Sequence, residues 1–185
     1  MRSPFRLYLI RHGQPSAGFI DAIDPGLSDV GTAQAQAVAR ELSALGPLPV
    51  LTSPLKRARE TAVPFEAIWN VTARVESRIA EIPSPSTNLG ERAVWIRQAL
   101  RGRWSDLPEA YQSWRTQLLQ CLLTCQTSAV MTTHFIAINV AVGFASNDDR
   151  LACFEPDYCS CTVLEVENEA LRVVSLGRQC ATLIR

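Results

Sequence analysis

The sequence contains two histidines, and each lies just after a short apolar run that predicts a buried strand. His12 follows the run Arg6–Ile10, and His134 follows the run Ala129–Thr132. In α/β folds, ligands bind beyond the carboxyl ends of the parallel strands. A single histidine in such a place is usually a satisfied core residue, but two histidines at strand ends indicate a shared site.

Two arginines occupy comparable places. Arg11 follows the first strand, and Arg57 lies in the first turns of a helix after the strand Pro49–Thr52, away from the apolar stripe of that helix. Guanidinium groups bind phosphoryl oxygens in a bidentate geometry, and helix N-termini add oriented N–H donors. A neutral imidazole can attack phosphorus when an acceptor holds its other nitrogen. Together with the histidines, these arginines predict a phosphate pocket with a nucleophilic histidine.

Apolar periodicity predicts the elements that position these residues. The pattern alternates strands with helices, which predicts an α/β sandwich with a mostly parallel sheet. The remaining strands are expected at Val71–Val75, Cys161–Val166 and Leu171–Leu176. The helices are expected at Ser28–Leu45, from Ser53-Pro54 onward, and at Gly90–Leu100, Leu107–Cys125 and Phe135–Phe144, the last of which is almost wholly apolar. The Pro- and Ser-rich segment Ile82–Asn88 is expected to be a loop.

Three of the predicted helices carry a start signal. Ser28 can cap the first, and Ser53 is followed by Pro54, which suits a first helical turn. Asp106-x-x-Glu109 resembles a capping box for the fourth helix.

Length and composition exclude several classes of protein. The chain has 185 residues, which fits a single domain over residues 1–185, and 47% of them are hydrophobic. Lys plus Arg and Asp plus Glu both number 18, so no basic excess indicates a nucleic-acid partner. The apolar run Leu7–Ile10 is too short for a signal peptide, and no later segment resembles a membrane span. A cytoplasmic protein without a membrane partner is therefore expected.

Two other groups of residues are expected to be structural. The six cysteines read as small buried hydrophobes; Cys121, Cys125, Cys159 and Cys161 lack the paired spacing of a zinc site. Four arginines form a solvated helix face with a lesser chance of contacting an anionic substrate: Arg92, Arg97, Arg101 and Arg103.

Four blocks of sequence together resemble the histidine phosphatase superfamily, the phosphoglycerate-mutase-like family. They are Arg11-His12-Gly13-Gln14, Leu27-Ser28-x-x-Gly31-x-x-Gln34-Ala35, Ser53-Pro54-Leu55-x-Arg57-Ala58-x-x-Thr61-Ala62 and Thr133-His134. The resemblance implies a three-layer α/β/α sandwich and an enzyme that needs no metal or cofactor. It also implies that His12 is phosphorylated, that Arg11 and Arg57 hold the phosphoryl oxygens, and that His134 stabilises the transferring group.

The chain departs from the family pattern at three places. Phe135 stands where glycine usually follows the second histidine, so its side chain narrows the pocket or shifts a backbone N–H. Gly18 stands near the usual position of a phosphate-contacting asparagine. The usual Trp-Glu-Gly segment is absent, and Glu81 lies in the segment that replaces it. Burial can keep a carboxyl group neutral, so Glu81 is the candidate general acid; its alternative is a surface loop residue, and Asp21 and Asp24 are weaker candidates.

The sequence therefore predicts a phosphatase that acts on a small phosphorylated metabolite through a phosphohistidine on His12. Gly13, Gln14 and Phe135 are expected to contact the substrate together with Arg11 and Arg57. A mutase is the nearest alternative, although the chain ends at Arg185, before the tail that helps mutases to retain the intermediate. A protein-phosphohistidine phosphatase and a non-catalytic anion-binding scaffold also stay open, as do the substrate and the oligomeric state.

Overall fold

A six-stranded sheet forms the centre of the computed structural model, which describes residues 3–18 and 21–180. The strands follow the order β3-β2-β4-β1-β5-β6 across the sheet. Their bounds are Phe5–Arg11 for β1, Val50–Thr52 for β2, Arg74–Val75 for β3, Ala129–Thr133 for β4, Cys161–Glu167 for β5 and Ala170–Ser175 for β6. Every predicted strand is present.

The four strands β3, β2, β4 and β1 are parallel, whereas β5 pairs antiparallel with β1 and β6 antiparallel with β5. The mostly parallel sheet expected from the sequence is therefore confirmed. Because β1 and β4 are parallel neighbours with Arg11 opposite Thr133, they end at the same edge of the sheet. Residues that follow these two strands are thus brought close together.

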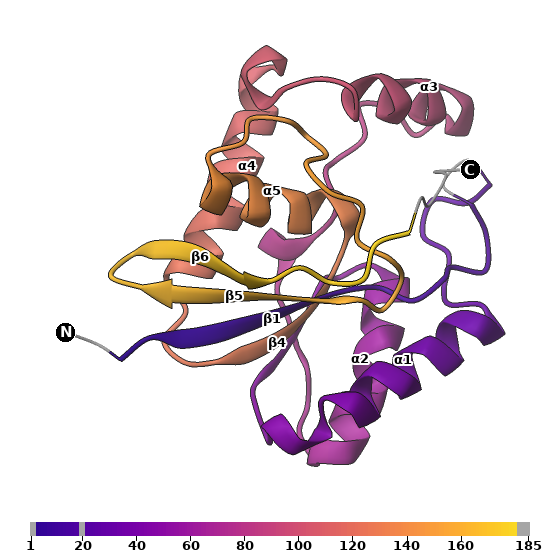
Figure 1. The fold of residues 1–185 in the computed structure, drawn as a ribbon. Coiled ribbons are helices and arrows are strands. Elements are labelled where there is room, and N and C mark those ends of the chain that lie inside the picture. The colour runs from indigo at the N-terminus through magenta and orange to yellow at the C-terminus, as the bar shows by residue number, and fades with distance from the viewer. Residues whose placement is uncertain (1–2, 19–20, 181–185) are drawn as a thin grey trace.

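Alternation along β1 builds two apolar cores. Leu7 and Leu9 belong to the core beneath one set of helices, whereas Tyr8 and Ile10 belong to the core beneath the other. Helices α1 (Asp29–Glu41) and α2 (Lys56–Trp69) cover one face of the sheet, and α4 (Glu109–Leu123) and α5 (Phe135–Ser146) cover the opposite face, with α3 (Leu89–Ala99) beyond them (Figure 1). This is the three-layer α/β/α sandwich that the resemblance implied.

The start signals of the predicted helices have different outcomes. Ser28 caps α1 as expected, since its Oγ accepts the Gly31 N–H at 3.1 Å. The α-helix itself ends at Glu41, earlier than predicted, and a 3₁₀ turn over Ser43–Leu45 follows. The expected capping box on α4 is wrong, because the helix begins after Pro108 with no side-chain cap.

The helix start predicted at Ser53 is also wrong. Helix α2 begins at Lys56, and its cap residue Leu55 provides no side-chain acceptor. Instead the carboxylate of Asp24, from the loop after β1, accepts the Lys56 N–H at 2.9 Å. The Ser53 Oγ accepts the Leu55 N–H at 3.3 Å, just before the helix, and it also has a second role, described below.

A close approach between two glycines joins the loop after β1 to helix α1. A Cβ atom on Gly13 would lie 2.5 Å from the Gly31 carbonyl oxygen, and one on Gly31 would overlap the backbone of Gln14. Ser28 completes this junction, since its N–H donates to the Gln14 carbonyl at 2.9 Å. The glycines of the first two sequence blocks are therefore needed for this contact.

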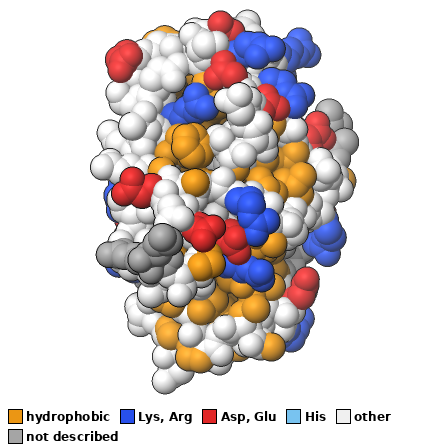
Figure 2. Space-filling model, turned by 60° about the vertical axis from the view of Figure 1, so that its left-hand side comes forward, with side chains coloured by type: hydrophobic (Ala, Val, Ile, Leu, Met, Phe, Trp, Pro, Cys, Tyr) orange, Lys and Arg blue, Asp and Glu red, His pale blue; other side chains and the backbone are white. Residues whose placement is uncertain are grey.

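The surface carries charges of both signs. Turning the molecule to bring the left side of Figure 1 forward exposes a face where acidic and basic side chains are intermixed with apolar ones (Figure 2). Within residues 3–18 and 21–180, no helix has the length and apolar character needed to cross a membrane.

The glycine contact yields a prediction about stability. We expect Gly31→Ala to lower the free energy of unfolding by about 1–3 kcal/mol, because the added methyl group meets backbone that cannot rotate away. Chemical denaturation measures this change. Gly90→Ala in α3 is the control; its Cβ would meet only the Asn88 side chain at 3.3 Å, and its stability should change by less than about 1 kcal/mol. Equal behaviour of the two variants would contradict the contact.

Candidate active site

The two histidines meet at the sheet edge where β1 and β4 end. His12 follows the last residue of β1, and His134 follows the last residue of β4 as the cap residue of α5. The His12 N–H donates to the Thr133 carbonyl at 2.9 Å, which continues the pairing of the two strands. As a result, the imidazole centroids lie 5.2 Å apart, and both side chains are buried.

His12 is held in a form suited to nucleophilic attack. Its Nδ1 lies 2.8 Å from the Gly13 carbonyl oxygen, which can only accept, so the proton is on Nδ1. Its Nε2 accepts a hydrogen bond from Arg57 Nε at 3.1 Å and therefore carries the lone pair. Burial, followed by the charges of Arg57 and Arg11, lowers the His12 pKa well below its ordinary value, despite the opposing bond to Gly13. The imidazole is thus neutral near neutral pH.

His134 is oriented by Ser53. Its Nε2 lies 2.7 Å from the Ser53 Oγ, whereas its buried Nδ1 has no hydrogen-bond partner among the described residues. Burial lowers the His134 pKa well below its ordinary value, and the charge of Arg57 acts in the same direction. In the neutral ring, Ser53 can donate to Nε2 and leave Nδ1–H as a donor for an anion. This role of Ser53 was missed by the sequence analysis, which assigned it to a helix cap.

Two buried guanidinium groups flank the imidazoles. Arg57 lies in the first turn of α2, and its Nη1 is 3.8 Å from Asp24 Oδ1. Arg11 ends β1, and its Nη1 donates to the Pro156 carbonyl at 2.8 Å. Burial lowers the pKa of both arginines, although the charges of nearby acidic groups partly offset it. The structure thus brings together the four residues that the sequence singled out.

Glu81 also reaches this cluster. It follows the 3₁₀ turn Ser77–Ile79, and its Oε2 accepts the Ile136 N–H at the start of α5 at 3.4 Å. Burial raises the pKa of Glu81, whereas hydrogen bonds and the charges of Arg57 and Arg11 partly counter this rise. The carboxyl group is therefore a partly buried member of the site and not a surface loop residue.

The weaker acid candidates have other contacts. Asp24 pairs with Arg57 and accepts the first N–H of α2, so its negative charge is engaged. Asp21 Oδ2 accepts the Gly18 N–H at 3.1 Å, within the loop after His12. Glu81, by contrast, bonds the first turn of the helix that His134 caps.

The three expected substrate contacts differ in position. Gly13 holds His12 through its carbonyl, and its N–H is taken by Thr61 Oγ1 at 3.1 Å, so it acts on the nucleophile. The Gln14 side chain is exposed, and its backbone joins the glycine contact with α1. Phe135 is buried at the start of α5, with its ring centroid 5.2 Å from the Arg11 Cζ.

Two residues in the site carry no local sequence signal. The Tyr158 ring lies 5.8 Å from the His12 ring and 4.1 Å from the Arg11 Cζ, although it comes from the loop before β5. Arg92 on α3 is buried, and its charge lowers the pKa of Arg57. The expectation of a solvated arginine face is therefore wrong for Arg92, while Arg97, Arg101 and Arg103 are exposed.

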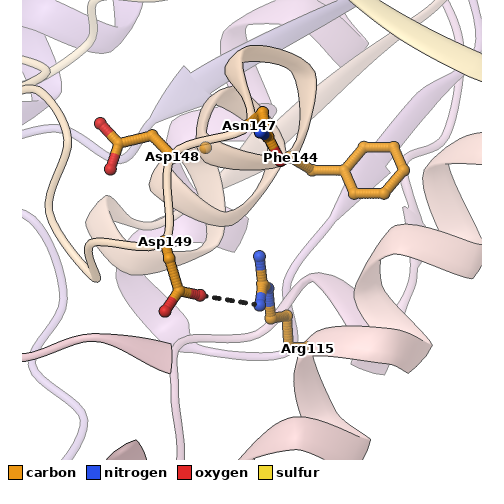
Figure 3. Close-up of a pocket in the computed structure, with 6 residues that line it drawn as sticks. Arg115, Phe144, Asn147, Asp148 and Asp149 are labelled. Atoms are coloured by element: carbon orange, nitrogen blue, oxygen red, sulfur yellow. Dashed lines mark ion pairs between the residues drawn. The ribbon is translucent and has the colours of Figure 1, made fainter. Parts of the chain in front are cut away.

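Within the described part of the chain, no three His, Cys, Asp or Glu side chains are grouped to bind a metal. The cysteines are free; Cys121 and Cys159 are buried, and three others are partly buried against the apolar cores, so the expectation is wrong only for the exposed Cys180. A pocket lined by Arg115, Phe144 and Asp149 lies at the far end of α5 from His134, with an ion pair of 3.6 Å across it (Figure 3).

Comparison with known proteins adds independent evidence. The model of the histidine phosphatase superfamily (branch 1) matches residues 7–179. Glucosyl-3-phosphoglycerate phosphatase of Mycobacterium tuberculosis is 32% identical over 114 residues, which are 60% of this chain and 48% of that protein. Phosphoserine phosphatase 1 of Hydrogenobacter thermophilus is 29% identical over 113 residues, 59% of this chain and 50% of that protein. The matched part thus spans about half the length of these relatives.

Solved structures share the fold. The mycobacterial glucosyl-3-phosphoglycerate phosphatase complexed with VO3 aligns with a TM-score of 0.74 at 21% identity, covering 92% of this chain and 98% of that one. The family model spans nearly the whole chain, and the histidines and arginines of its motif converge at one sheet edge. The chain therefore belongs to the histidine phosphatase superfamily.

Proposed function

We propose that this chain is a phosphatase that hydrolyses the phosphate monoester of a small metabolite through a phosphohistidine on His12. One observation carries the proposal: the Nε2 lone pair of a neutral, buried His12 points at the guanidinium of Arg57. A phosphoryl group that replaced His12 as the acceptor for Arg57 would lie directly before this lone pair. Arg11 and the Nδ1–H of His134 would supply further donors to its oxygens.

The first step transfers the phosphoryl group to the enzyme. The Nε2 lone pair forms the N–P bond while the bond from phosphorus to the ester oxygen breaks, and the leaving oxygen receives the proton of Glu81. The Gly13 carbonyl holds the Nδ1–H throughout and stabilises the positive charge that develops on the ring. The raised pKa of Glu81 supports this assignment, because a carboxyl group must be protonated to act as an acid.

The second step releases phosphate. The ionised Glu81 takes a proton from water as the water oxygen attacks phosphorus, and the N–P bond breaks to return the lone pair to His12. Both products leave, and Glu81 is protonated again. The buried guanidinium groups stabilise the charge on the equatorial oxygens in both steps, so no metal ion is required.

Relatives favour hydrolysis over transfer to a second substrate. The proteins reported above are named as phosphatases of glucosyl-3-phosphoglycerate and of phosphoserine. A small phosphorylated metabolite is therefore the proposed substrate class for this chain, in place of a phosphoprotein or a mutase substrate. The retention of both histidines and both arginines argues against a non-catalytic scaffold, which would show no turnover of p-nitrophenyl phosphate.

We expect His12 to carry phosphate during turnover. Brief exposure to a ³²P-labelled monoester in the presence of EDTA, followed by denaturation in alkali, should trap an acid-labile, base-stable label on the protein. His12→Asn should abolish the label because its amide nitrogen has no lone pair available for attack. Label that persists in His12→Asn, or that requires added Mg²⁺, would contradict this reaction.

We expect Ser53→Ala to lower kcat/KM by about tenfold, because His134 loses the hydrogen bond that orients it. Steady-state kinetics with p-nitrophenyl phosphate measure the effect. Thr52→Val is the matched control: this neighbouring hydroxyl is equally buried but bonds a backbone carbonyl at 3.1 Å. If both variants lose activity equally, the loss comes from packing and not from His134.

We expect Glu81→Gln to affect substrates according to their leaving groups. An alkyl alcohol needs a proton as it departs, so alkyl phosphate hydrolysis should fall by about 100-fold or more. p-Nitrophenolate leaves without one, so kcat/KM for its ester should fall much less. The comparison uses kcat/KM because this constant reports transfer to His12 and not the later hydrolysis, in which Glu81 acts as a base for both substrates. Because a general acid must be protonated, the wild-type alkyl rate should decline as pH rises through the raised pKa of Glu81, and this limb should vanish in the variant.

The same comparison on Asp24→Asn and Asp21→Asn tests the weaker candidates. Equal, small effects of Glu81→Gln on both substrates would exclude Glu81 as the acid. A leaving-group dependence that appeared in Asp24→Asn instead would move the acid to the loop after His12.

A further inference from the structure

A turn between α5 and β5 encloses Arg11. The residues of this turn have no part in the proposed reaction. The Arg11 N–H donates to the Ser160 carbonyl at 3.3 Å, and the Arg11 carbonyl accepts from Cys159 N–H at 3.0 Å. The guanidinium donates to the Pro156 carbonyl at 2.8 Å. Three hydrogen bonds therefore fix residues 156–160 to the end of β1.

The backbone of this turn is specially shaped. Cys159 has a φ of 50°, in the left-handed region that residues with a side chain rarely adopt. Asp157 closes the turn, since its carbonyl accepts the Ser160 N–H at 3.1 Å and its carboxylate accepts the Tyr158 N–H at 2.8 Å. These contacts determine where the Tyr158 side chain lies.

Two aromatic rings contact the Arg11 guanidinium. Its Cζ is 4.1 Å from the Tyr158 ring centroid and 5.2 Å from that of Phe135. Both distances are within the range of cation–π attraction. The two rings come from opposite ends of the segment between β4 and β5, so the fold brings them to Arg11 from separate elements.

Aromatic contacts suit an arginine that must bind phosphate. The N–H donors of a guanidinium lie in its plane, so a ring against its face restrains that plane without occupying the donors. Bidentate binding of a phosphoryl group depends on the orientation of this plane. A long side chain with many rotamers would otherwise lose this orientation.

We infer that Tyr158 and Phe135 are positioning residues that fix the Arg11 guanidinium for phosphate binding. This inference rests on the proposed function, because Arg11 has a reason to be oriented only if a phosphoryl group binds there. It also accounts for the aromatic residue at position 135, where the family usually has glycine. The side chain that was expected to narrow the pocket is placed against the phosphate-binding arginine.

Affinity for inorganic phosphate, measured by isothermal titration calorimetry, tests the inference without requiring turnover. Tyr158→Leu and Phe135→Leu should each weaken phosphate binding by about 5- to 30-fold, the range that a desolvated cation–π contact gives. Tyr158→Phe keeps the ring and should bind within about twofold of the wild type. Tyr111→Leu is the matched control, because it removes a partly buried ring that stacks on Trp95 at 5.5 Å outside the site.

Near-normal phosphate affinity in both Tyr158→Phe and Tyr111→Leu would support positioning. If the loss of any packed ring weakened phosphate binding, Tyr111→Leu would lose affinity as Tyr158→Leu does. Unchanged affinity in both Tyr158→Leu and Phe135→Leu would overturn the inference. It would also be overturned if Tyr158→Phe lost as much affinity as Tyr158→Leu, since the phenol would then bind phosphate itself. An error in the proposed reaction can be distinguished from an error in this inference. If the reaction were wrong, the wild type would still bind phosphate but would show neither turnover nor the His12 label.

Discussion

The rest of the site depends on keeping the His12 imidazole neutral beside two arginines. Its pKa is lowered first by burial and then by these positive charges, so the Nε2 lone pair persists where a solvent-exposed histidine would begin to be protonated. The same burial that preserves the nucleophile lowers the pKa of the arginines themselves. A dianionic phosphoryl group relieves this concentration of positive charge, which explains why such a cluster should bind phosphate strongly.

The fold provides what this arrangement requires. Parallel pairing of β1 with β4 brings the two imidazoles to one edge, and the β1 backbone continues the pairing through His12. The glycine contact with α1 and the Thr61 hydroxyl fix the backbone of Gly13, whose carbonyl selects the His12 tautomer. Ser53 performs the equivalent task for His134. The residue types of the motif blocks thus have a physical basis, because several residues of these blocks hold His12 or His134 in place.

The sequence predicted elements and strand ends well, but it did not predict contacts made across the fold. Apolar periodicity located all six strands, and placement at strand ends grouped His12, Arg11, Arg57 and His134. Cap assignments at Ser53 and at Asp106-x-x-Glu109 were wrong, because local signals do not reveal that a distant Asp24 caps α2 or that Ser53 bonds His134. Tyr158 could not have been found, and the buried Arg92 could not be distinguished from the three exposed arginines grouped with it, since both positions depend on long-range packing.

The stereochemical course at phosphorus tests the central claim most directly. A monoester made chiral with ¹⁶O, ¹⁷O and ¹⁸O can be hydrolysed in the presence of an alcohol acceptor, and the configuration of the transferred phosphoryl group determined by ³¹P NMR. Two in-line displacements, first by His12 and then by the acceptor, predict net retention of configuration. Net inversion would mean a single direct attack on the substrate, and it would contradict a covalent phosphohistidine.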